Sequence, residues 1–331
     1  MNMSRPLVAS LRRCVPLGGG RATRRRFVPA LSVIRTLPAL QIHSLNCCMM
    51  HTERLDGITK KLSVSSKIIV LDGNLAAGKT TLGRKLAEKM GLLYFEEASV
   101  PYWEKKSKER ALPPPPFKGS CSLEKFYADP KSPDGNSVRL QLLMYHTRLL
   151  QYSDALEHLL NTGQGVILDR SLYSDFVFVD TMHKSGFLEK HAVDYYYEAR
   201  ANSTLAILPP HIVLYLDVPV PEIQHRLIQR GRPFEQNISD SYLQDIEDVY
   251  KSKFLPEMSL TSEVLQYDWS TFGDVDKVAD YVKSVHLTKG PWLLQTDSSL
   301  HQLKMLVENK HRVANLMKIS RVIPEVTAGV C

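Results

Sequence analysis

Short apolar runs alternate along the chain with longer segments in which apolar residues recur every three or four positions. The runs are rich in β-branched residues and predict buried strands at residues 67–72, 92–95, 165–169, 211–217 and 263–267. The periodic segments predict helices at residues 79–90, 137–161, 221–230, 239–252 and 273–286. Strands separated by helices are typical of βαβ units, so the pattern predicts an α/β fold with a five-stranded parallel sheet flanked by helices.

Two segments interrupt this alternation. Residues 104–121 contain four consecutive prolines at 113–116, which predicts a loop. Beyond residue 288 no further strand is predicted, and a helix is predicted at 298–317. The pattern therefore predicts a main domain at residues 53–288 and a helical C-terminal extension at residues 289–331.

Residues 1–52 have a composition of their own, with eight arginines and no lysine, aspartate or glutamate. Because the whole chain carries +7, the remainder carries −1, and nothing in its charge favours nucleic acid as a partner. An Arg-rich, acid-free amino-terminal segment is typical of a mitochondrial transit peptide, cleaved here between about residues 35 and 52. The alternative is a basic tail that binds nucleic acid or anionic lipid.

The overall composition excludes several other classes. The chain is 44% hydrophobic and 23% charged, which is typical of a globular protein. No stretch approaches the roughly 18 apolar residues that a membrane-spanning helix needs. Five cysteines without C-x-x-C spacing indicate neither a disulfide scaffold nor a cysteine metal site.

A phosphate-binding motif follows the first predicted strand. Gly73-Asn-Leu-Ala-Ala-Gly78-Lys79-Thr80 matches G-x-x-x-x-G-K-[ST] between a strand and a helix, the context that this motif requires. The glycines let backbone N–H groups surround phosphates, Lys79 would neutralise the outer phosphates, and Thr80 would ligate Mg²⁺. The predicted phosphate-binding residues are Gly73, Asn74, Ala76, Ala77, Gly78, Lys79, Thr80 and Thr81.

Further polar residues follow the other predicted strands, at the edge where ligands bind in parallel sheets. Asp169 closes the third strand and would hold Mg²⁺ through water, and Arg170 would contact transferring phosphoryl groups. Asp72, at the end of the first strand, either hydrogen-bonds the loop or ends in solvent. Arg230 and Arg232 follow a predicted helix and are either a lid over phosphates or a solvated basic helix end.

Together these motifs resemble the deoxyribonucleoside kinase family, which has a P-loop kinase-like fold and uses ATP with Mg²⁺. The resemblance implies that Glu97 is the general base for a sugar 5′-hydroxyl and that Arg170 lies beside the reacting phosphates. It implies that Arg230 and Arg232 contact phosphates and that Glu235 and Tyr127 hold the sugar 3′-hydroxyl.

The same resemblance assigns the base of the nucleoside to Gln141, Arg148 and Asp175. Gln141 and Arg148 are seven residues apart on a predicted helix and therefore share one face. In a non-catalytic protein these residues have another interpretation: Arg148 and Asp175 form a buried ion pair, and Gln141 is a core amide.

Longer strings resemble a narrower family, the kinase-like accessory subunits of mitochondrial complex I, from about residue 65 to the end. Examples are Leu149-Leu-Gln-Tyr-Ser-Asp-Ala-Leu-Glu-His-Leu-Leu160 and Phe254-Leu-Pro-Glu-Met258. This resemblance implies a non-catalytic subunit on the matrix side of the inner membrane. Its partners would be other complex I subunits, and it would support assembly and electron transfer from NADH to ubiquinone. The family has an association with FAD, but no motif in this chain explains it.

Two hypotheses therefore stay open. The favoured one is an accessory subunit that retains a nucleotide site, and the alternative is an active mitochondrial deoxyribonucleoside kinase. The complete loop with Lys79 and Thr80 favours kinase chemistry, whereas the missing proline after Glu97 departs from the active kinases. An adenylate- or thymidylate-type kinase would not explain the helix that carries Gln141 and Arg148, and no motif supports electron transfer by this chain.

Overall fold

The computed structural model describes residues 58–109, 112–285, 287 and 296–318, so the predicted transit peptide lies outside the described residues. Within them, five parallel strands form one sheet in the order β2-β3-β1-β4-β5. The strands are β1 (Ile68–Gly73), β2 (Leu93–Phe95), β3 (Val166–Asp169), β4 (Ile212–Asp217) and β5 (Glu263–Asp268). The predicted α/β fold and parallel sheet are confirmed, with each strand within one residue of its expected position.

The central strands are the most deeply buried part of the molecule. Every residue of β1 and β3 is buried, as are the first five residues of β4. Burial on both faces explains why these strands read as continuous apolar runs. Leu71 of β1 lies in register with Asp169 of β3 and Leu214 of β4, so the carboxyl ends of three strands meet at one edge. That edge carries the predicted site.

Helices connect the strands. Those that lie between β1 and β4 are α2 (Lys79–Met90), α3 (Val100–Glu109), α4 (Leu123–Ala128), α5 (Asn136–Thr162), α6 (Phe176–Lys184) and α7 (Lys190–Ala206). After β4 come α8 (Val220–Arg230), α9 (Asp240–Val249), a π-helical segment (Tyr250–Phe254), α10 (Leu255–Met258) and α11 (Val275–Ser284). The helix α1 (Ile58–Lys61) precedes the sheet, and α12 (Asp297–Glu308) and α13 (Lys310–Asn315) follow it.

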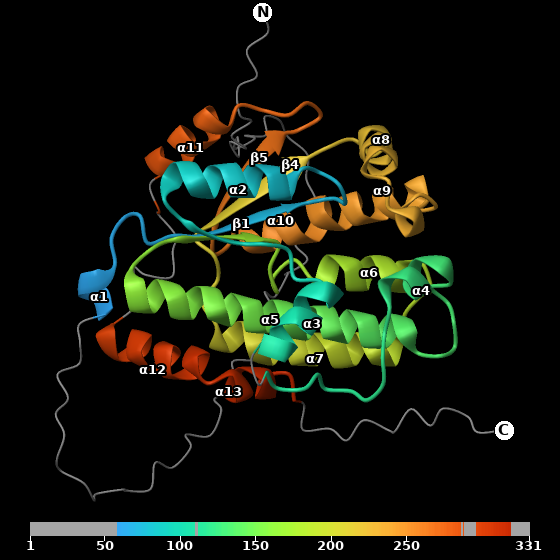
Figure 1. Ribbon diagram of the computed structural model, residues 1–331, viewed down its shortest axis with the longest axis horizontal. Coiled ribbons are helices and arrows are strands. Elements are labelled where there is room, and N and C mark those ends of the chain that lie inside the picture. The colour runs from blue at the N-terminus through green and yellow to red at the C-terminus, as the bar shows by residue number, and fades with distance from the viewer. Residues whose placement is uncertain (1–57, 110–111, 286, 288–295, 319–331) are drawn as a thin grey trace, which may run out of the picture. The chain divides into compact units, whose positions relative to one another are not determined.

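The sheet lies between two layers of helices. Figure 1 shows α11 at the top of the view, α2 across the strands, and α5, α6 and α7 below them. The helices α12 and α13, in red, lie below α5 and pack against it. Leu300, Val307 and Met317 are fully or almost fully buried in this contact region. The Lys310 ammonium lies 2.8 Å from both Asp154 and Glu157 of α5, which adds ion pairs to the apolar contact.

Three predicted boundaries differ from the structure. Residues 104–109 belong to α3 rather than to a loop, because helical structure continues to Glu109, four residues before the first of the prolines. The helix predicted at 298–317 is broken at Asn309, whose side chain accepts from Arg312 N and caps α13. The helix predicted at 239–252 continues through the π segment to Met258. The sequence analysis did not predict α1, α3, α4, α6 or α7.

None of the described helices combines the length and the apolar character needed to cross a bilayer. The longest, α5, carries polar side chains along its length, and several of them are buried inside the protein. Gln141, Arg148 and Gln151 are examples.

Two glycines that end helices provide a test of the packing around the sheet. Gly91 after α2 and Gly163 after α5 are both in the left-handed region, with φ of 66° and 76°. A Cβ at Gly91 would meet nothing within 4 Å, whereas a Cβ at Gly163 would lie 2.2 Å from the Lys61 carbonyl oxygen. We predict that Gly91→Ala lowers the free energy of unfolding by about 1 kcal/mol and that Gly163→Ala lowers it by at least about 1 kcal/mol more.

Denaturant unfolding measures this difference when the m-values of both variants equal that of the wild type. Equal losses of unfolding free energy in the two variants would contradict the close approach of α1 to the end of α5.

Candidate functional site

The phosphate loop has the expected structure between β1 and α2. Gly73 and Gly78 have φ of 143° and 95°, which favour glycine. A Cβ at Gly73 would lie 2.7 Å from the Leu216 carbonyl oxygen, so β4 also leaves no room for a side chain there. Gly78 precedes α2 and has no side chain to accept from the N–H groups of the first turn. These groups are therefore available to an anion.

Lys79 is buried under this loop. Its ammonium donates to the Asn74 carbonyl at 2.8 Å and to the Gly73 carbonyl at 3.3 Å. Burial, together with the nearby charge of Arg170, lowers the pKa of Lys79 to about 8. The Asn74 side chain donates to the Leu243 carbonyl at 2.9 Å, so it anchors the loop on α9.

Thr80 and Asp169 meet at the expected position for Mg²⁺. The Thr80 hydroxyl donates to Asp169 Oδ2 at 2.6 Å, while Asp169 Oδ1 is buried and has no hydrogen-bond partner. Burial and the negative charge of Glu97 raise the pKa of Asp169. The described residues hold no cluster of three or more His, Cys, Asp or Glu suited to a metal. Mg²⁺ in phosphate sites needs only one or two protein oxygens beside phosphates and water, so Thr80 and Asp169 fit it.

Arg170 lies at the centre of the site. It is almost fully buried and has a φ of 61°, in the left-handed region that non-glycine residues rarely adopt. Its guanidinium forms an ion pair with Glu97 and donates to the Gly73 carbonyl at 2.9 Å. Its Nε also donates to the Tyr250 hydroxyl at 3.3 Å, and that hydroxyl donates to Asp72 at 3.2 Å. Asp72 is fully buried, so of its two alternatives the one that places the carboxylate in solvent is wrong.

Glu97 lines the cleft and faces two arginines. Its carboxylate is paired with Arg170 and lies 3.6 Å from Arg148. Burial alone would raise the pKa of Glu97, but the charges of Arg170, Lys79 and Arg148 outweigh it and lower the pKa to about 2. Glu97 is therefore ionised at neutral pH.

The three residues expected at the nucleoside base form one buried cluster. Gln141 Nε2 donates to Asp175 Oδ2 at 2.6 Å, and Arg148 forms an ion pair with the other oxygen of Asp175. Asp175 is fully buried, whereas Gln141 and Arg148 also line the cleft. The predicted shared face of α5 is confirmed. The buried ion pair exists in the protein alone.

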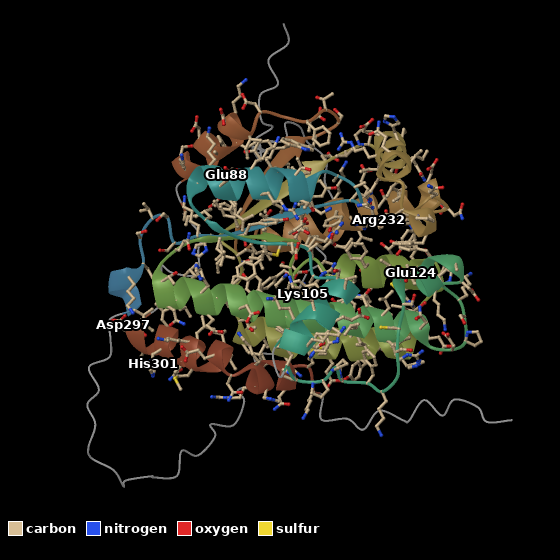
Figure 2. All side chains as sticks on the ribbon, viewed as in Figure 1. Glu88, Lys105, Glu124, Arg232, Asp297 and His301 are labelled. Carbon is tan, nitrogen blue, oxygen red and sulfur yellow. The ribbon has the colours of Figure 1, made fainter. Side chains whose placement is uncertain are left out.

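The predicted lid residues contact one another. Arg230 and Arg232 both pair with the buried carboxylate of Glu235, Arg232 at 3.3 Å. Tyr127 stacks on Phe234, with 6.0 Å between ring centroids. Figure 2 shows Arg232 and Glu124 on the same side of the molecule, and both line the cleft.

These groups line one open cleft of about 1220 Å³. Most of the predicted side chains reach it, whereas Asn74, Asp169 and Asp175 do not line it. The cleft also contains apolar side chains that the sequence analysis did not select. Phe178 is the clearest, because the guanidinium groups of Arg148 and Arg170 lie 5.4 and 5.1 Å from its ring centroid. Its position three residues after Asp175 on α6 is the signal that would have found it.

A further group borders the phosphate loop. Arg226 on α8 donates to the Ala77 carbonyl at 3.2 Å, and its guanidinium lies 4.7 Å from the ring centroid of Phe272. Both residues line the cleft. Arg226 thus connects α8 to the loop.

Comparisons with known proteins agree with this architecture. The model of the family described as deoxynucleoside kinase matches residues 69–289. The Bos taurus mitochondrial protein NADH dehydrogenase (ubiquinone) 1 alpha subcomplex subunit 10 is 51% identical over 82% of this chain and 79% of its own length. The Rattus norvegicus protein of that name is 46% identical over 92% of this chain and 88% of its own. A deoxyguanosine kinase of Dictyostelium discoideum is 34% identical over 68% of this chain and 72% of its own.

The buried ion pair generates a stability prediction. Asp175→Asn would leave the Arg148 charge buried without its closest partner, so we expect the free energy of unfolding to fall by about 3 kcal/mol. Asp194→Asn removes one partner of the exposed Lys190 pair on α7 and should change it by less than about 0.5 kcal/mol. Denaturant unfolding compares the two variants. A loss at Asp175 as small as that at Asp194 would contradict the assignment of a structural role to the pair.

Proposed function

The chain belongs to the deoxynucleoside kinase family and, within it, to the family of NADH dehydrogenase (ubiquinone) 1 alpha subcomplex subunit 10, and from this we propose that it is a nucleotide-binding accessory subunit of mitochondrial complex I. The observation that carries the assignment is 51% identity to the bovine subunit over 79% of that protein's length. A family fold alone would not assign this role, because one fold supports many functions. The acid-free arginine-rich segment at residues 1–52 supports a mitochondrial location on the matrix side of the inner membrane.

Nucleotide binding is supported by the phosphate loop and its surroundings. The loop has the backbone that phosphate contacts require, and Lys79 lies beneath it. Thr80 and Asp169 would hold Mg²⁺, which would neutralise phosphate charge when bound. The cleft of about 1220 Å³ extends from this loop to Gln141 and Arg148, so it has room for a triphosphate together with a second ligand.

Kinase activity is the second candidate, favoured by the position of Glu97 in the cleft beside Arg170. In that reaction Glu97 would accept the proton of a deoxynucleoside 5′-hydroxyl, and the γ-phosphoryl of ATP would transfer to the resulting oxygen. Lys79 and Arg170 would stabilise the charge on the transferred group. However, the charges of Arg170, Lys79 and Arg148 lower the pKa of Glu97, which weakens it as a base in the protein alone. We favour the accessory role because of the identity to the bovine subunit.

Assembly is tested by blue-native separation of detergent-solubilised mitochondria and detection of this chain. We expect it to migrate with the NADH dehydrogenase band. Lys79→Ala should enter the same band at the wild-type level, because Lys79 contacts the loop rather than an outer surface. Migration of the wild-type chain as a small species would overturn the accessory role. Phosphate transfer to a panel of deoxynucleosides would then test the kinase alternative.

The lowered pKa of Lys79 predicts a pH dependence of ATP binding. Bound phosphates would raise the pKa of Lys79 above its free value of about 8, so binding above pH 8 requires proton uptake. Affinity should therefore fall as the pH rises through 8, by about tenfold between pH 7 and pH 9. Calorimetric titration measures it. Lys79→Met should bind more weakly and with no such dependence, and an equal dependence in both proteins would exclude Lys79 as its source.

A further inference from the structure

A tyrosine that belongs to no recognised motif contacts the predicted Mg²⁺ site. Tyr94, on β2, has its hydroxyl 3.5 Å from Asp169 Oδ2, the oxygen that also accepts from Thr80. A tyrosine phenol ordinarily keeps its proton at physiological pH. It can therefore act as a hydrogen-bond donor at this position.

The opposing helix is adapted to this side chain. Gly83 lies in the interior of α2, where glycine is the least favourable residue other than proline. An ideal Cβ at Gly83 would lie 2.6 Å from Tyr94 Cε2 and 2.7 Å from Leu71 Cδ1. Any larger residue at position 83 would displace the Tyr94 ring or the Leu71 side chain. A glycine therefore occupies a position of α2 at which the Tyr94 ring leaves no room for a Cβ.

The consequence for Asp169 is a difference between its two oxygens. Thr80 Oγ1 and the Tyr94 hydroxyl both donate to Oδ2, whereas Oδ1 is buried and has no hydrogen-bond partner. The short Thr80 contact at 2.6 Å sets the rotation of the carboxylate about its χ2 bond, and the longer Tyr94 contact at 3.5 Å supports the same rotation. The other oxygen, Oδ1, has no hydrogen bond within the protein and is the one that would accept from a water coordinated to Mg²⁺.

We propose that Tyr94 is a positioning residue for Mg²⁺, which acts by holding Asp169 and Thr80 in the orientation that a Mg²⁺–nucleotide complex requires. This inference rests on the proposed nucleotide binding. Residues that orient metal ligands in this way typically contribute about tenfold or more to metal affinity. Tyr94 does so from β2, the strand at the edge of the sheet next to β3.

The alternative is that Tyr94 only fills the space above Gly83. Tyr94→Phe separates the two roles, because it keeps the ring and removes the hydroxyl. For each protein, ATP affinity is measured by calorimetric titration with excess Mg²⁺ and with EDTA, and the ratio of the two affinities gives the Mg²⁺ enhancement. We expect Tyr94→Phe to reduce this enhancement by about tenfold. Its affinity in EDTA and its thermal midpoint should match those of the wild type.

Tyr197→Phe is the matched control. The Tyr197 hydroxyl donates to the Asp180 carboxylate at 2.6 Å, and its ring is half-buried like that of Tyr94. This hydrogen bond joins α7 to α6, and neither Tyr197 nor Asp180 is a predicted Mg²⁺ ligand. This variant should retain the wild-type Mg²⁺ enhancement.

Gly83→Ala provides a second variant in which the hydroxyl is still present. The added methyl group should displace the Tyr94 ring and reduce the Mg²⁺ enhancement in the same way. Glycine to alanine is otherwise favourable in a helix, so a loss of enhancement would not follow from helix propensity. If this variant does not fold, Tyr94→Phe still decides the question.

The outcomes distinguish the inference from the proposed function. If the wild type binds ATP with an Mg²⁺ enhancement that Tyr94→Phe retains in full, the positioning role is overturned and nucleotide binding stands. If Tyr94→Phe loses affinity equally with Mg²⁺ and with EDTA, the hydroxyl serves the loop rather than the metal, and the inference is again wrong. If the wild type binds no ATP, the proposed nucleotide binding fails and the inference fails with it.

Discussion

The buried guanidinium of Arg170 is the interaction on which the arrangement of the site depends. It joins the end of β3 to the phosphate loop through the Gly73 carbonyl and to β2 through Glu97. It also reaches the π-helical segment through Tyr250. A buried charge is tolerated only when its hydrogen-bonding capacity is met, and here a carboxylate, loop carbonyls and a phenol meet it together. The left-handed backbone at Arg170 is strained for a non-glycine residue, and this set of contacts compensates for that strain.

The contacts of Arg170 determine the electrostatics of its neighbours. Its charge lowers the pKa of Glu97 and adds to the effect of burial on Lys79. Burial raises the pKa of Asp72 to about 6, although Ser174, Arg170 and Lys79 all act in the opposite direction. The cleft therefore holds carboxylates and cations that moderate one another in the absence of ligand. A phosphate that enters the loop would change the pKa values of these groups. Among the neighbouring groups whose pKa lies above 7, Lys79 has the value closest to neutral, at about 8.

The sequence predicted the parts of this site that are local. The loop motif, the strand ends and the seven-residue spacing of Gln141 and Arg148 all depend on residues that are close along the chain. The central strands β1, β3 and β4 were predicted because burial on both faces leaves a continuous apolar run. The approach of Tyr94 to Gly83 depends instead on how β2 packs against α2, and the contact of Tyr250 with Asp72 joins residues 178 positions apart. Neither has a signature in the sequence, since Gly83 reads only as an unfavourable helix residue.

The missed helices have a related explanation. In α7 the buried positions include Tyr196, Ala199 and Ser203, so a tyrosine and a serine take places that a pattern search expects to be aliphatic. The hydroxyls of Tyr145 and Ser203 hydrogen-bond to each other across α5 and α7. Polar groups paired between two helices cancel the contrast between faces on which helix prediction relies. For the same reason, the sequence allowed two interpretations of Arg148 and Asp175, as substrate contacts or as an ion pair in the core.

The burial of Arg148, Asp175 and Lys79 indicates which of these residues the fold requires and which it does not. Arg148 and Asp175 stabilise one another, so a protein with no catalytic activity would still need both. Lys79 differs from this pair. Its ammonium is buried against carbonyls, and its pKa is lowered. A lowered pKa means that the charged form of Lys79 is less favourable in the folded protein than in the unfolded chain. Stability alone would favour an uncharged residue at this position. The nucleotide that we propose would supply the anionic partner that Lys79 lacks on the loop carbonyls. Lys79, rather than the arginines, is therefore the stronger structural support for a bound nucleotide.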